Sequence, residues 1–491
     1  MEKDIFQERA EKVKKLRETG VDPYPYRFEV TGKTKELTEK YKDLEIGKHL
    51  EEDIYSVAGR IMSLREHGKS AFGHIKDGAG LLQLYFKMDL LGEQQWELFK
   101  KLDIGDFIGV KGDIFKTRTG EVTIRVRELT LLSKSMLPLP EKWHGLKDVE
   151  IRYRQRYLDM IANPEVKDTF YTRSCVIKLI RKFLEEKSFL EVETPMMHSI
   201  PGGAAAKPFK TFHNALGIEL FMRIAPELYL KRLLVGGFER VFEINRNFRN
   251  EGISIKHNPE FTMLELYQAY ADYGDMMELT EEIFEYVAKN IFGTTKIVYQ
   301  EKEIDFARPW KRISMADSVK EVTGIDVANL GFEEIKTACA AKNIEFAPVP
   351  SKGQLINELF EKVVEHTLIQ PTIIKDYPIE ISPLAKKKRD DDMLVERFEV
   401  FIFGRETANA FSELNDPVDQ KERFLKQIDH EKEAELKKLD HDYITALEHG
   451  MPPAGGLGIG IDRMVMFFTN SPSIRDVILF PQMRPKDEEG V

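Results

Sequence analysis

Five short stretches rich in β-branched and aromatic residues follow one another between residues 54 and 135, and no other feature constrains the fold of this chain more. Turn signals such as "DGAG" (77–80) and "TRTG" (117–120) separate them, and a helix-like segment, "GEQQWELFKKL", precedes the last two. Five strands with a helix before the last two form the pattern of an OB-fold barrel, a common oligonucleotide binder. A small β-domain with a structural role would show the same pattern, so the strands alone do not decide the function.

Charge is distributed unevenly along the chain. The net charge of −10 argues mildly against a nucleic-acid partner. Residues 58–135, however, hold 13 Lys and Arg against 10 Asp and Glu, a balance of 13 − 10 = +3. This local excess favours an oligonucleotide-binding barrel, although ordinary scatter of surface charge would also produce it.

Length and composition indicate a protein of several domains without a membrane segment. The chain has 491 residues, 42% of them apolar, which allows two or more domains. Its start, "MEKDIFQERA", lacks the apolar region of a signal peptide, and no apolar run approaches the roughly 20 residues of a membrane span. Cys175 and Cys339 are too few for a disulfide framework or a Cys-rich zinc site. We therefore expect a cytoplasmic protein with no membrane partner.

The pattern predicts four segments. Residues 1–53 form an N-terminal helix and an irregular connector, 54–137 the OB-fold barrel, 138–149 a linker, and 150–491 a larger domain. In the larger domain, helices flank antiparallel strands without the βαβ alternation of a parallel sheet, which predicts an α+β fold. The chain contains no GxxxxGK[ST] phosphate loop and no GxGxxG after a strand.

The stretch "FRNEGISIKHNPEFTMLELY" (248–267) combines an arginine with an alternating apolar run. If it forms an antiparallel hairpin, strand alternation places Arg249 near Phe261 on one face, with Glu265 and Tyr267 further along. The planar fork of an arginine suits a phosphate, and an aromatic ring offers a stacking surface for a base. A charged surface hairpin is the alternative, but it would not be expected to place Phe261 beside its charges.

Glycines occupy every second position of "AGGLGIGIDRMVMFF" (454–468), at Gly456, Gly458 and Gly460. A strand face without side chains often marks the close approach of a ligand or of another backbone. Tight packing between sheet and helix would explain the glycines, but it would not explain Arg463 at the start of the following helix.

Two carboxylates seven residues apart, Glu399 and Glu406, lie in "RFEVFIFGRETANAFSELND" (397–416). In one unbroken strand they would face opposite ways, so they converge only if the chain turns, and Gly404 is the expected position of that turn. Paired carboxylates can hold Mg²⁺ against the phosphates of a nucleotide. Exposed acids on an edge strand are the alternative for this element taken alone.

Taken together and in this order, these stretches resemble the motifs of class II aminoacyl-tRNA synthetases, most closely the bacterial-type lysyl-tRNA synthetases of subclass IIb. The segment "FLEEKSFLEVETPMM" (183–197) resembles motif 1, the 248–267 stretch motif 2, and "GLGIGIDRMVMFF" motif 3. The barrel resembles the anticodon-binding domain of that subclass, and the likeness extends from about residue 5 to residue 485. The resemblance implies a homodimer that uses ATP, Mg²⁺, L-lysine and tRNA(Lys).

The resemblance also implies roles for residues that match the motifs. Arg249 and Arg463 would be catalytic, and the ATP site would comprise Arg249, Glu251, His257, Asn258, Phe261, Glu399, Glu406, Gly460 and Arg463, with Glu399 and Glu406 holding the metal. The lysine site would comprise Gly203, Glu227, Arg249, Glu265, Tyr267, Asn409 and Glu413. The anticodon would be contacted by Arg65, Phe72, Gln83 and Glu128.

The implied function is ATP-dependent attachment of L-lysine to tRNA(Lys) through a lysyl-adenylate, with release of AMP and pyrophosphate. Glu265, Tyr267 and Glu413 suit an ε-ammonium group, whereas an aspartate site would need a cation there. The alternatives are an aspartyl- or asparaginyl-type enzyme of the same subclass and an RNA-binding paralogue without activation activity. A protein-modifying lysyl ligase is a further alternative, but such relatives lack the barrel.

Overall fold

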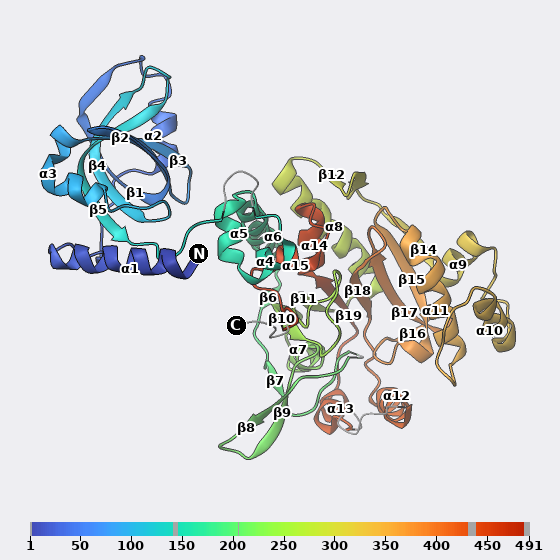
Figure 1. Cartoon of the computed structure of the whole chain (residues 1–491). Coiled ribbons are helices and arrows are strands. Elements are labelled where there is room, and N and C mark those ends of the chain that lie inside the picture. Colours follow the sequence, from blue (N-terminus) through green and yellow to red (C-terminus); the bar gives the residue numbers. More distant parts are fainter. Residues whose placement is uncertain (1, 141–145, 205, 431–437, 486–491) are drawn as a thin grey trace. The chain divides into compact units, whose positions relative to one another are not determined.

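The computed structural model describes residues 2–140, 146–204, 206–430 and 438–485, and the chain divides into two compact units, 1–147 and 148–491 (Figure 1). The first unit contains a closed barrel with the strand order β1-β2-β3-β5-β4, as the sequence predicts for an OB-fold. Its elements are β1 (His49–His67), β2 (Ser70–Lys76), β3 (Leu81–Lys87), α3 (Met88–Phe99), β4 (Phe107–Lys116) and β5 (Val122–Ser133), preceded by α1 (Glu2–Glu18) and α2 (Thr34–Lys40).

Alternation along the strands builds the barrel core. Strand β3 buries Leu82, Leu84 and Phe86 and turns the intervening Gln83 and Tyr85 outward. The outward residues of β2 and β3 therefore form a surface that a ligand can reach, while the inward ones exclude water.

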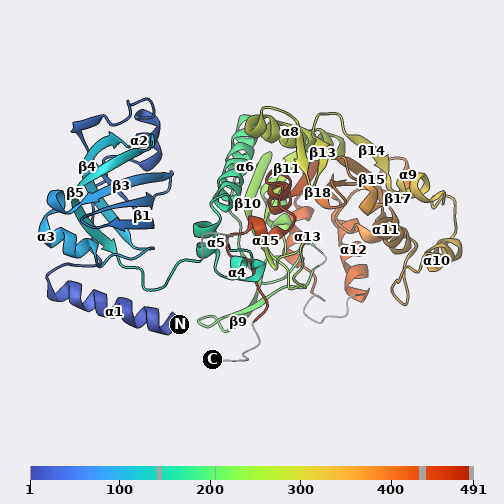
Figure 2. The same cartoon turned by 45° about the horizontal axis from the view of Figure 1, so that its top comes forward.

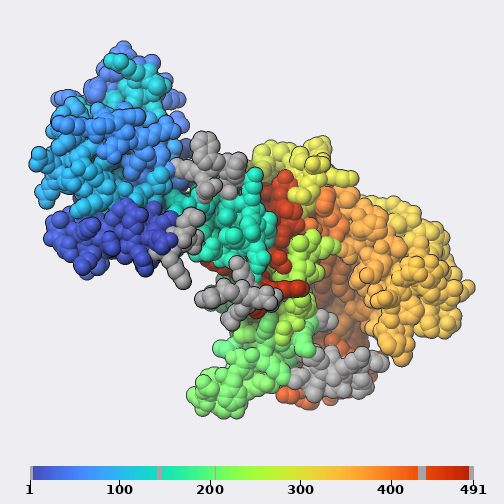
Figure 3. Space-filling view, viewed as in Figure 1, coloured from blue at the N-terminus to red at the C-terminus, as the bar shows by residue number. Residues whose placement is uncertain are grey.

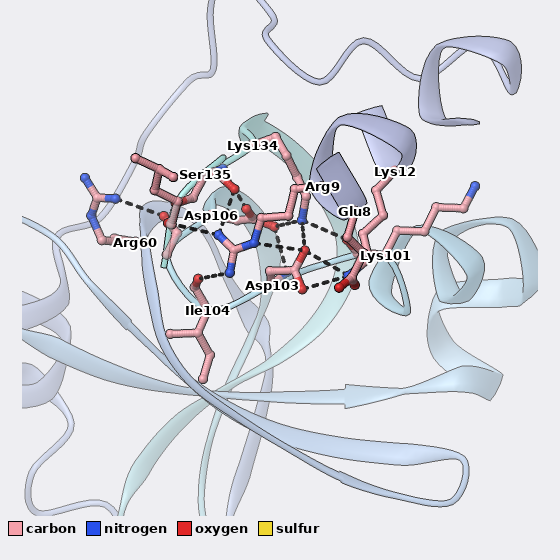
Figure 4. A network of polar contacts seen from close by, with 12 residues as sticks. Glu8, Arg9, Lys12, Arg60, Lys101, Asp103, Ile104, Asp106, Lys134 and Ser135 are labelled. Atoms are coloured by element: carbon pink, nitrogen blue, oxygen red, sulfur yellow. Dashed lines mark hydrogen bonds and ion pairs between the residues drawn. The ribbon is translucent and has the colours of Figure 1, made fainter. Parts of the chain in front are cut away.

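Helix α1 is fastened to the barrel by a network of buried charges (Figure 4). The guanidinium of Arg9 donates to the backbone carbonyls of Ser135 and Leu137, at 2.8 and 3.1 Å. Beside it, the fully buried ammonium of Lys134 donates to Asp106 at 2.7 Å and also pairs with Asp103. Charges removed from water in this way persist only when paired, so these contacts hold the helix against this end of the barrel.

The second unit is built on a nine-stranded, mainly antiparallel sheet with the order β14-β15-β17-β18-β19-β11-β10-β6, in which β16 also pairs with β17 (Figures 1 and 2). The strands are β6 (Leu190–Glu191), β10 (Arg240–Phe248), β11 (Glu260–Ala269), β14 (Lys311–Ser314), β15 (Thr372–Pro378), β16 (Lys387–Lys388), β17 (Asp391–Phe401), β18 (Glu406–Ser412) and β19 (Ala454–Gly460). Only the pairs β14–β15 and β6–β10 are parallel, so the predicted α+β class is confirmed.

Helices cover this sheet. Helices α6 (Val166–Glu186), α8 (Tyr273–Phe292) and α14 (Ile461–Phe468) share one core cluster with the central strands. A second cluster joins α7 (Glu227–Val235), α9 (Met315–Thr323), α10 (Phe332–Ala341), α11 (Lys352–Val363) and α13 (His441–Glu448). The remaining helices are α4 (Val149–Arg154), α5 (Arg156–Ala162), α12 (Pro417–His430) and α15 (Ile474–Val477), with short 3₁₀ turns η1 (Glu365–Thr367) and η2 (Ile379–Ile381). The apolar side of α6 contributes Val176, Ile180, Phe183 and Leu184 to the first of these clusters.

Two small sheets complete the unit. Strands β7 (Met197–His198), β8 (Lys210–His213) and β9 (Ile218–Met222) form a three-stranded sheet, and the green segment that contains β8 and β9 projects from the body of the unit (Figure 3). Strands β12 (Lys296–Tyr299) and β13 (Lys302–Asp305) form a separate pair. Among the described residues, no helix is long and apolar enough to cross a membrane.

Some predicted boundaries differ from the structure. The strand pattern over 395–414 forms a hairpin, β17 and β18, because the chain turns between them at the position expected for Gly404. The sequence pattern predicts a helix over 352–366, whereas α11 ends at Val363 and a 3₁₀ turn follows at Glu365–Thr367. The pattern also predicts a helix over 418–439. In the structure α12 begins at Pro417 and extends to His430, and residues 431–437 lie outside the described part of the chain.

Candidate active site

Five strands of the central sheet place side chains in one row on the same face. Glu399 stands opposite Asn409, Asn409 opposite Gly458, Gly458 opposite Glu265, and Glu265 opposite Glu243. Directly opposite residues of antiparallel strands point to the same side of a sheet. The face that strand alternation predicts for the 240–267 hairpin is therefore confirmed, and the sheet register brings the other two motifs to it.

A cavity of about 820 Å³ lies over this face. Every site residue that the resemblance assigns to the second unit lines it: Gly203, Glu227, Arg249, Glu251, His257, Asn258, Phe261, Glu265, Tyr267, Glu399, Glu406, Asn409, Glu413, Gly460 and Arg463. Residues more than 250 positions apart in sequence thus meet at one site, and its two ends differ in charge.

One end of the cavity carries two guanidinium groups. Arg249 lies 5.0 Å from the centre of the Phe261 ring, and its buried Nε has no hydrogen-bond partner within the described structure. Arg463, in the first turn of α14, contacts the backbone carbonyl of Glu406, and its Nη2 lies 3.5 Å from Nε2 of His257. Two cations beside an aromatic ring fit an anionic ligand that also carries a flat base.

Two carboxylates flank the hairpin turn beside these arginines. Phe403 and Gly404 both have positive φ angles, 52° and 63°, and the turn directs Glu399 and Glu406 into the cavity, as the sequence predicts for Gly404. Glu399 accepts hydrogen bonds from the Tyr377 hydroxyl at 2.9 Å and from Arg397, and burial raises its pKa to about 7. A bound cation would offset the cost of ionising this carboxyl group.

The described residues contain no group of three or more Asp, Glu, His or Cys side chains that could hold a metal by themselves. Mg²⁺ in nucleotide sites is bound by one or two carboxylates together with phosphate oxygens. The oxygen donors of Glu399 and Glu406, next to two guanidinium groups, fit that arrangement.

The far end of the cavity is acidic and buried. The Oε1 of Glu265 lies 3.4 Å from Nδ2 of Asn247, and its Oε2 lies 3.5 Å from the Tyr267 hydroxyl. Burial, together with the charge of Glu227, raises the pKa of Glu265 to about 8. Oε1 of Glu413 is buried and accepts no hydrogen bond from the described residues, so it is free to receive a cation from the cavity.

Gly203 adopts a left-handed conformation, with φ +88°. A Cβ there would lie 3.2 Å from Cβ of Ala225 and 3.3 Å from Cβ of Glu227, tighter than most side-chain contacts. A glycine therefore lets the backbone at this position lie directly against Glu227 at the cavity wall.

The loop between β10 and β11 is braced from within. The side-chain amide of Asn258 donates to the carbonyl of Glu260 at 2.6 Å and accepts from the backbone N–H of Gln482 at 3.2 Å. The Ser254 hydroxyl lies 3.1 Å from Nδ1 of His257. Asn258 thus holds the loop at the cavity edge, while Glu251 is exposed on it.

On the barrel, three of the four predicted anticodon residues lie together. Arg65 is opposite Phe72, and Phe72 is opposite Tyr85, with the two rings 4.8 Å apart. Next to them, the amide of Gln83 donates to Glu121 at 2.6 Å and accepts from Thr123 at 2.7 Å. An outward aromatic pair beside an oriented amide can stack and read a single-stranded base.

The structure does not bring Glu128 to this group. Glu128 pairs with Lys111 on β4 at 3.3 Å, and it lies five residues beyond Thr123 on β5, about 16 Å at the usual rise of a strand. Glu121, which is not among the residues expected from the sequence, occupies the corresponding place beside Gln83. Only the parallel pairing of β3 with β5 identifies Glu121. Because this pairing joins residues that are distant in the sequence, no local sequence pattern points to it.

Two further residues at or behind the cavity wall were not expected from the sequence, and only the first of them, Arg397, lines the cavity. Arg397 shares a strand face with Glu399, two residues away, and its guanidinium donates to Asn409 at 3.0 Å. Lys231 follows Glu227 by one helical turn on α7, and the i, i+4 spacing was the only sequence signal for it.

Comparison with known proteins agrees with this geometry. The family model described as "tRNA synthetases class II (D, K and N)" matches residues 148–484, and the model "OB-fold nucleic acid binding domain" matches residues 55–132. Proteins called lysine–tRNA ligase are similar to the chain over nearly its whole length. That of Pelotomaculum thermopropionicum is 58% identical, and the match covers 99% of this chain and 96% of the relative. That of Carboxydothermus hydrogenoformans is 56% identical, and the match covers 99% of each. That of Halalkalibacterium halodurans is 52% identical, covering 99% of this chain and 97% of the relative. The chain therefore belongs to the class II aminoacyl-tRNA synthetases, in the group that serves aspartate, lysine and asparagine.

Proposed function

We propose that the protein attaches L-lysine to tRNA(Lys) through a lysyl-adenylate, releasing AMP and pyrophosphate. The observation that carries the proposal is the polarity of the cavity: Arg249 and Arg463 lie at one end, and Glu265, Glu413 and Tyr267 at the other. ATP fits the first end and an amino acid with a cationic side chain fits the second. The names of the similar proteins agree with this assignment.

In the first step, the carboxylate of lysine attacks the α-phosphorus of ATP and pyrophosphate leaves. Arg249 would grip the α-phosphate and the lysine carboxylate, because its unpartnered Nε and the rest of its fork remain available to both. Phe261 would stack against one side of the adenine, and Arg463 would cover the other and reach the γ-phosphate. Catalysis then rests on orientation and on charge stabilisation rather than on a protein nucleophile.

The remaining residues would hold the two substrates in register. Glu251, His257, Asn258 and Gly460 would lie along the ATP, and Gly203 and Glu227 would receive the α-ammonium of lysine, with Asn409 at its carboxylate. Glu265, Tyr267 and Glu413 would bind the ε-ammonium. A neutral isostere of lysine would leave the buried carboxylates of this end without a cationic partner. Because an unpaired buried charge costs free energy, such an isostere would bind poorly.

Glu399 and Glu406 would hold Mg²⁺, whose chemistry at this site is to neutralise negative charge on the triphosphate. Burial raises the pKa of Glu399 to about 7, so it can lose its proton when a cation arrives near neutral pH. Tyr377 and Arg397 keep the Glu399 carboxylate oriented toward the cavity while the phosphates bind.

The barrel would recognise the anticodon of tRNA(Lys). Phe72 would stack on a base while Arg65 contacts the backbone and Gln83 reads a base edge. We keep Glu128 as a candidate contact, and Glu121 joins it because it orients the amide of Gln83. In the second step, a ribose hydroxyl at the tRNA end attacks the activated carbonyl and AMP leaves.

A homodimer in the cytoplasm completes the proposal. Exposed apolar side chains on the second unit, among them Tyr171, Leu190 and Met197, would be covered by the second copy. Light scattering of the purified protein would test this, since a monomeric mass at micromolar concentration would contradict it.

Amino-acid-dependent exchange of pyrophosphate into ATP tests the function. We expect lysine alone to support exchange, and aspartate and asparagine to give none. Exchange with aspartate or asparagine only would assign the chain to a sister enzyme. Binding of tRNA without exchange for any amino acid would instead favour the RNA-binding paralogue.

A further inference from the structure

Lys231 lies behind the acidic end of the cavity. Its side chain is fully buried on α7, and it is absent from the residues that line the cavity. Its Nζ donates to Oε1 of Glu227, one helical turn earlier, at 2.6 Å, and it also contacts Oε2 of Glu413. The protein therefore supplies its own ammonium to a pocket that the proposed function assigns to an ammonium substrate.

The two oxygens of Glu413 have different surroundings. Neither oxygen accepts a hydrogen bond from the described residues, but Oε2 forms an ion pair with the ammonium of Lys231 inside the protein, and Glu413 lines the cavity. Space for Oε1 exists only because position 456 is a glycine, since a Cβ there would collide with it. The contact with Lys231 thus fixes one oxygen and leaves the other toward the cavity.

Charge counting gives this contact a functional meaning. Three carboxyl groups, those of Glu227, Glu265 and Glu413, line the acidic end, and one internal ammonium compensates one of them. Nearby, Arg223 is paired with Glu243 at 2.6 Å and adds no net charge. Two negative charges remain, which equals the two ammonium groups of lysine, while Arg249 faces the lysine carboxylate.

We propose that Lys231 is a positioning residue that fixes the Glu413 carboxylate toward the substrate and limits the acidic end to two uncompensated charges. This inference rests on the proposed function, because it assumes that lysine is the amino acid bound. Lys231 touches neither substrate and acts through Glu413. The pocket therefore selects an amino acid with two ammonium groups by charge count as well as by shape.

The pKa directions of the pair agree with the geometry. Burial opposes the charge on Lys231, but Glu227 and Glu413 outweigh burial and raise its pKa, so the ammonium persists. Burial raises the pKa of Glu413, and Lys231 opposes that rise. Without Lys231, the acidic end would hold a proton in place of the ammonium, and that proton would have no fixed position among the carboxyl groups.

Lysine-dependent pyrophosphate exchange by the full-length protein provides the test, with KM for lysine, KM for ATP and kcat measured separately. The variants are Lys231→Met, Glu413→Gln and the two combined. The matched control is Lys134→Met, because Lys134 is also fully buried between two carboxylates but lies in the barrel. Thermal unfolding of each variant reports any loss of stability.

We expect Lys231→Met to raise the KM for lysine about ten-fold or more, because a proton without a fixed position then replaces the ammonium and the Glu413 carboxylate is no longer held toward the substrate. The KM for ATP should stay within about two-fold of that of the unmodified protein, because the substitution weakens the binding of lysine and not the binding of ATP. Lys134→Met should lower stability without changing the KM for lysine. An unchanged lysine KM in Lys231→Met overturns the inference.

The double variant keeps the test decisive even if Lys231→Met does not fold. Glu413→Gln alone leaves one uncompensated charge, whereas Lys231→Met with Glu413→Gln restores two. The double variant should therefore have a lysine KM equal to or lower than that of Glu413→Gln, and a higher one overturns the inference. If the unmodified protein shows no lysine-dependent exchange, the proposed function fails instead, so the two failures are distinguishable.

Discussion

At the acidic end of the cavity, the side chain of Glu413 occupies the space that a side chain at position 456 would need. A Cβ at position 456 would collide with Oε1 of Glu413 and would lie 2.6 Å from Cε1 of Tyr267. The glycine therefore makes room for the carboxylate that we assign to the ε-ammonium of lysine. Of the alternating glycines of β19, Gly456 is therefore the one required by the side chain of Glu413, which directly follows β18.

Gly456→Ala should raise the KM for lysine by at least about ten-fold while leaving the KM for ATP nearly unchanged, because the added methyl group displaces Glu413 and Tyr267. Pyrophosphate exchange with each substrate varied in turn measures both constants. Gly78→Ala is the matched control, since a Cβ at Gly78 meets nothing within 4 Å. Equal rises in the two KM values would place Gly456 outside the lysine end.

Glu413→Gln should mainly raise the KM for lysine, by roughly 10- to 100-fold, because a hydrogen bond to a charged group contributes about 1.5–3 kcal/mol. The same exchange assay measures it. The control is Glu321→Gln, an exposed glutamate paired with Lys311. An unchanged lysine KM in Glu413→Gln would remove Glu413 from the pocket.

Arg249→Gln should lower kcat/KM for exchange by roughly 100- to 1,000-fold, the usual effect of removing a group that stabilises transition-state charge. Arg246→Gln is a control from β10, the strand that directly precedes Arg249, because Arg246 faces the opposite side of the sheet and pairs with Glu260 at 3.6 Å. Comparable losses in the two variants would indicate a general effect on β10 rather than a phosphate contact.

The KM for lysine should depend on pH through Glu265. Burial raises the pKa of its carboxyl group to about 8, and lysine binds the ionised form, so below pH 8 binding must first release a proton. The KM should therefore fall by up to about ten-fold per unit as pH rises from 6.5 to 8 and then level off. Glu265→Gln should raise the KM and remove this dependence. A pH profile that keeps its slope in Glu265→Gln would assign the titration to another group.

Phe72→Ala should weaken tRNA binding by roughly 1–3 kcal/mol, the contribution of stacking one base on an aromatic ring, and should leave lysine-dependent exchange intact. Filter binding with tRNA(Lys) measures the first and the exchange assay the second. Phe107→Ala, at an exposed phenylalanine covered by Arg60, is the control on the barrel. Equal tRNA affinities of Phe72→Ala and the unmodified protein would contradict an anticodon contact by this ring.

The sequence by itself determined the OB-fold, the α+β class and the shared face of Arg249, Phe261, Glu265 and Tyr267. These features follow from local rules: strand residues alternate with period two, and five β-rich stretches with one helix allow few topologies. The turn at Gly404 followed in the same way from the odd spacing of Glu399 and Glu406. The assignment to the lysine pocket came from a resemblance of motifs rather than from these rules.

Only the tertiary structure decided which distant residues meet. The row from Glu399 to Glu243 depends on the order and register of five strands, which alternation within each strand cannot fix. For the same reason, the structure brings Glu121 rather than Glu128 to Gln83, because β3 pairs with the beginning of β5. The i, i+4 partner of Lys231, Glu227, is visible in the sequence. Its contact with Glu413, however, exists only because α7 packs against the face of the sheet that carries Val241, Tyr267 and Phe411.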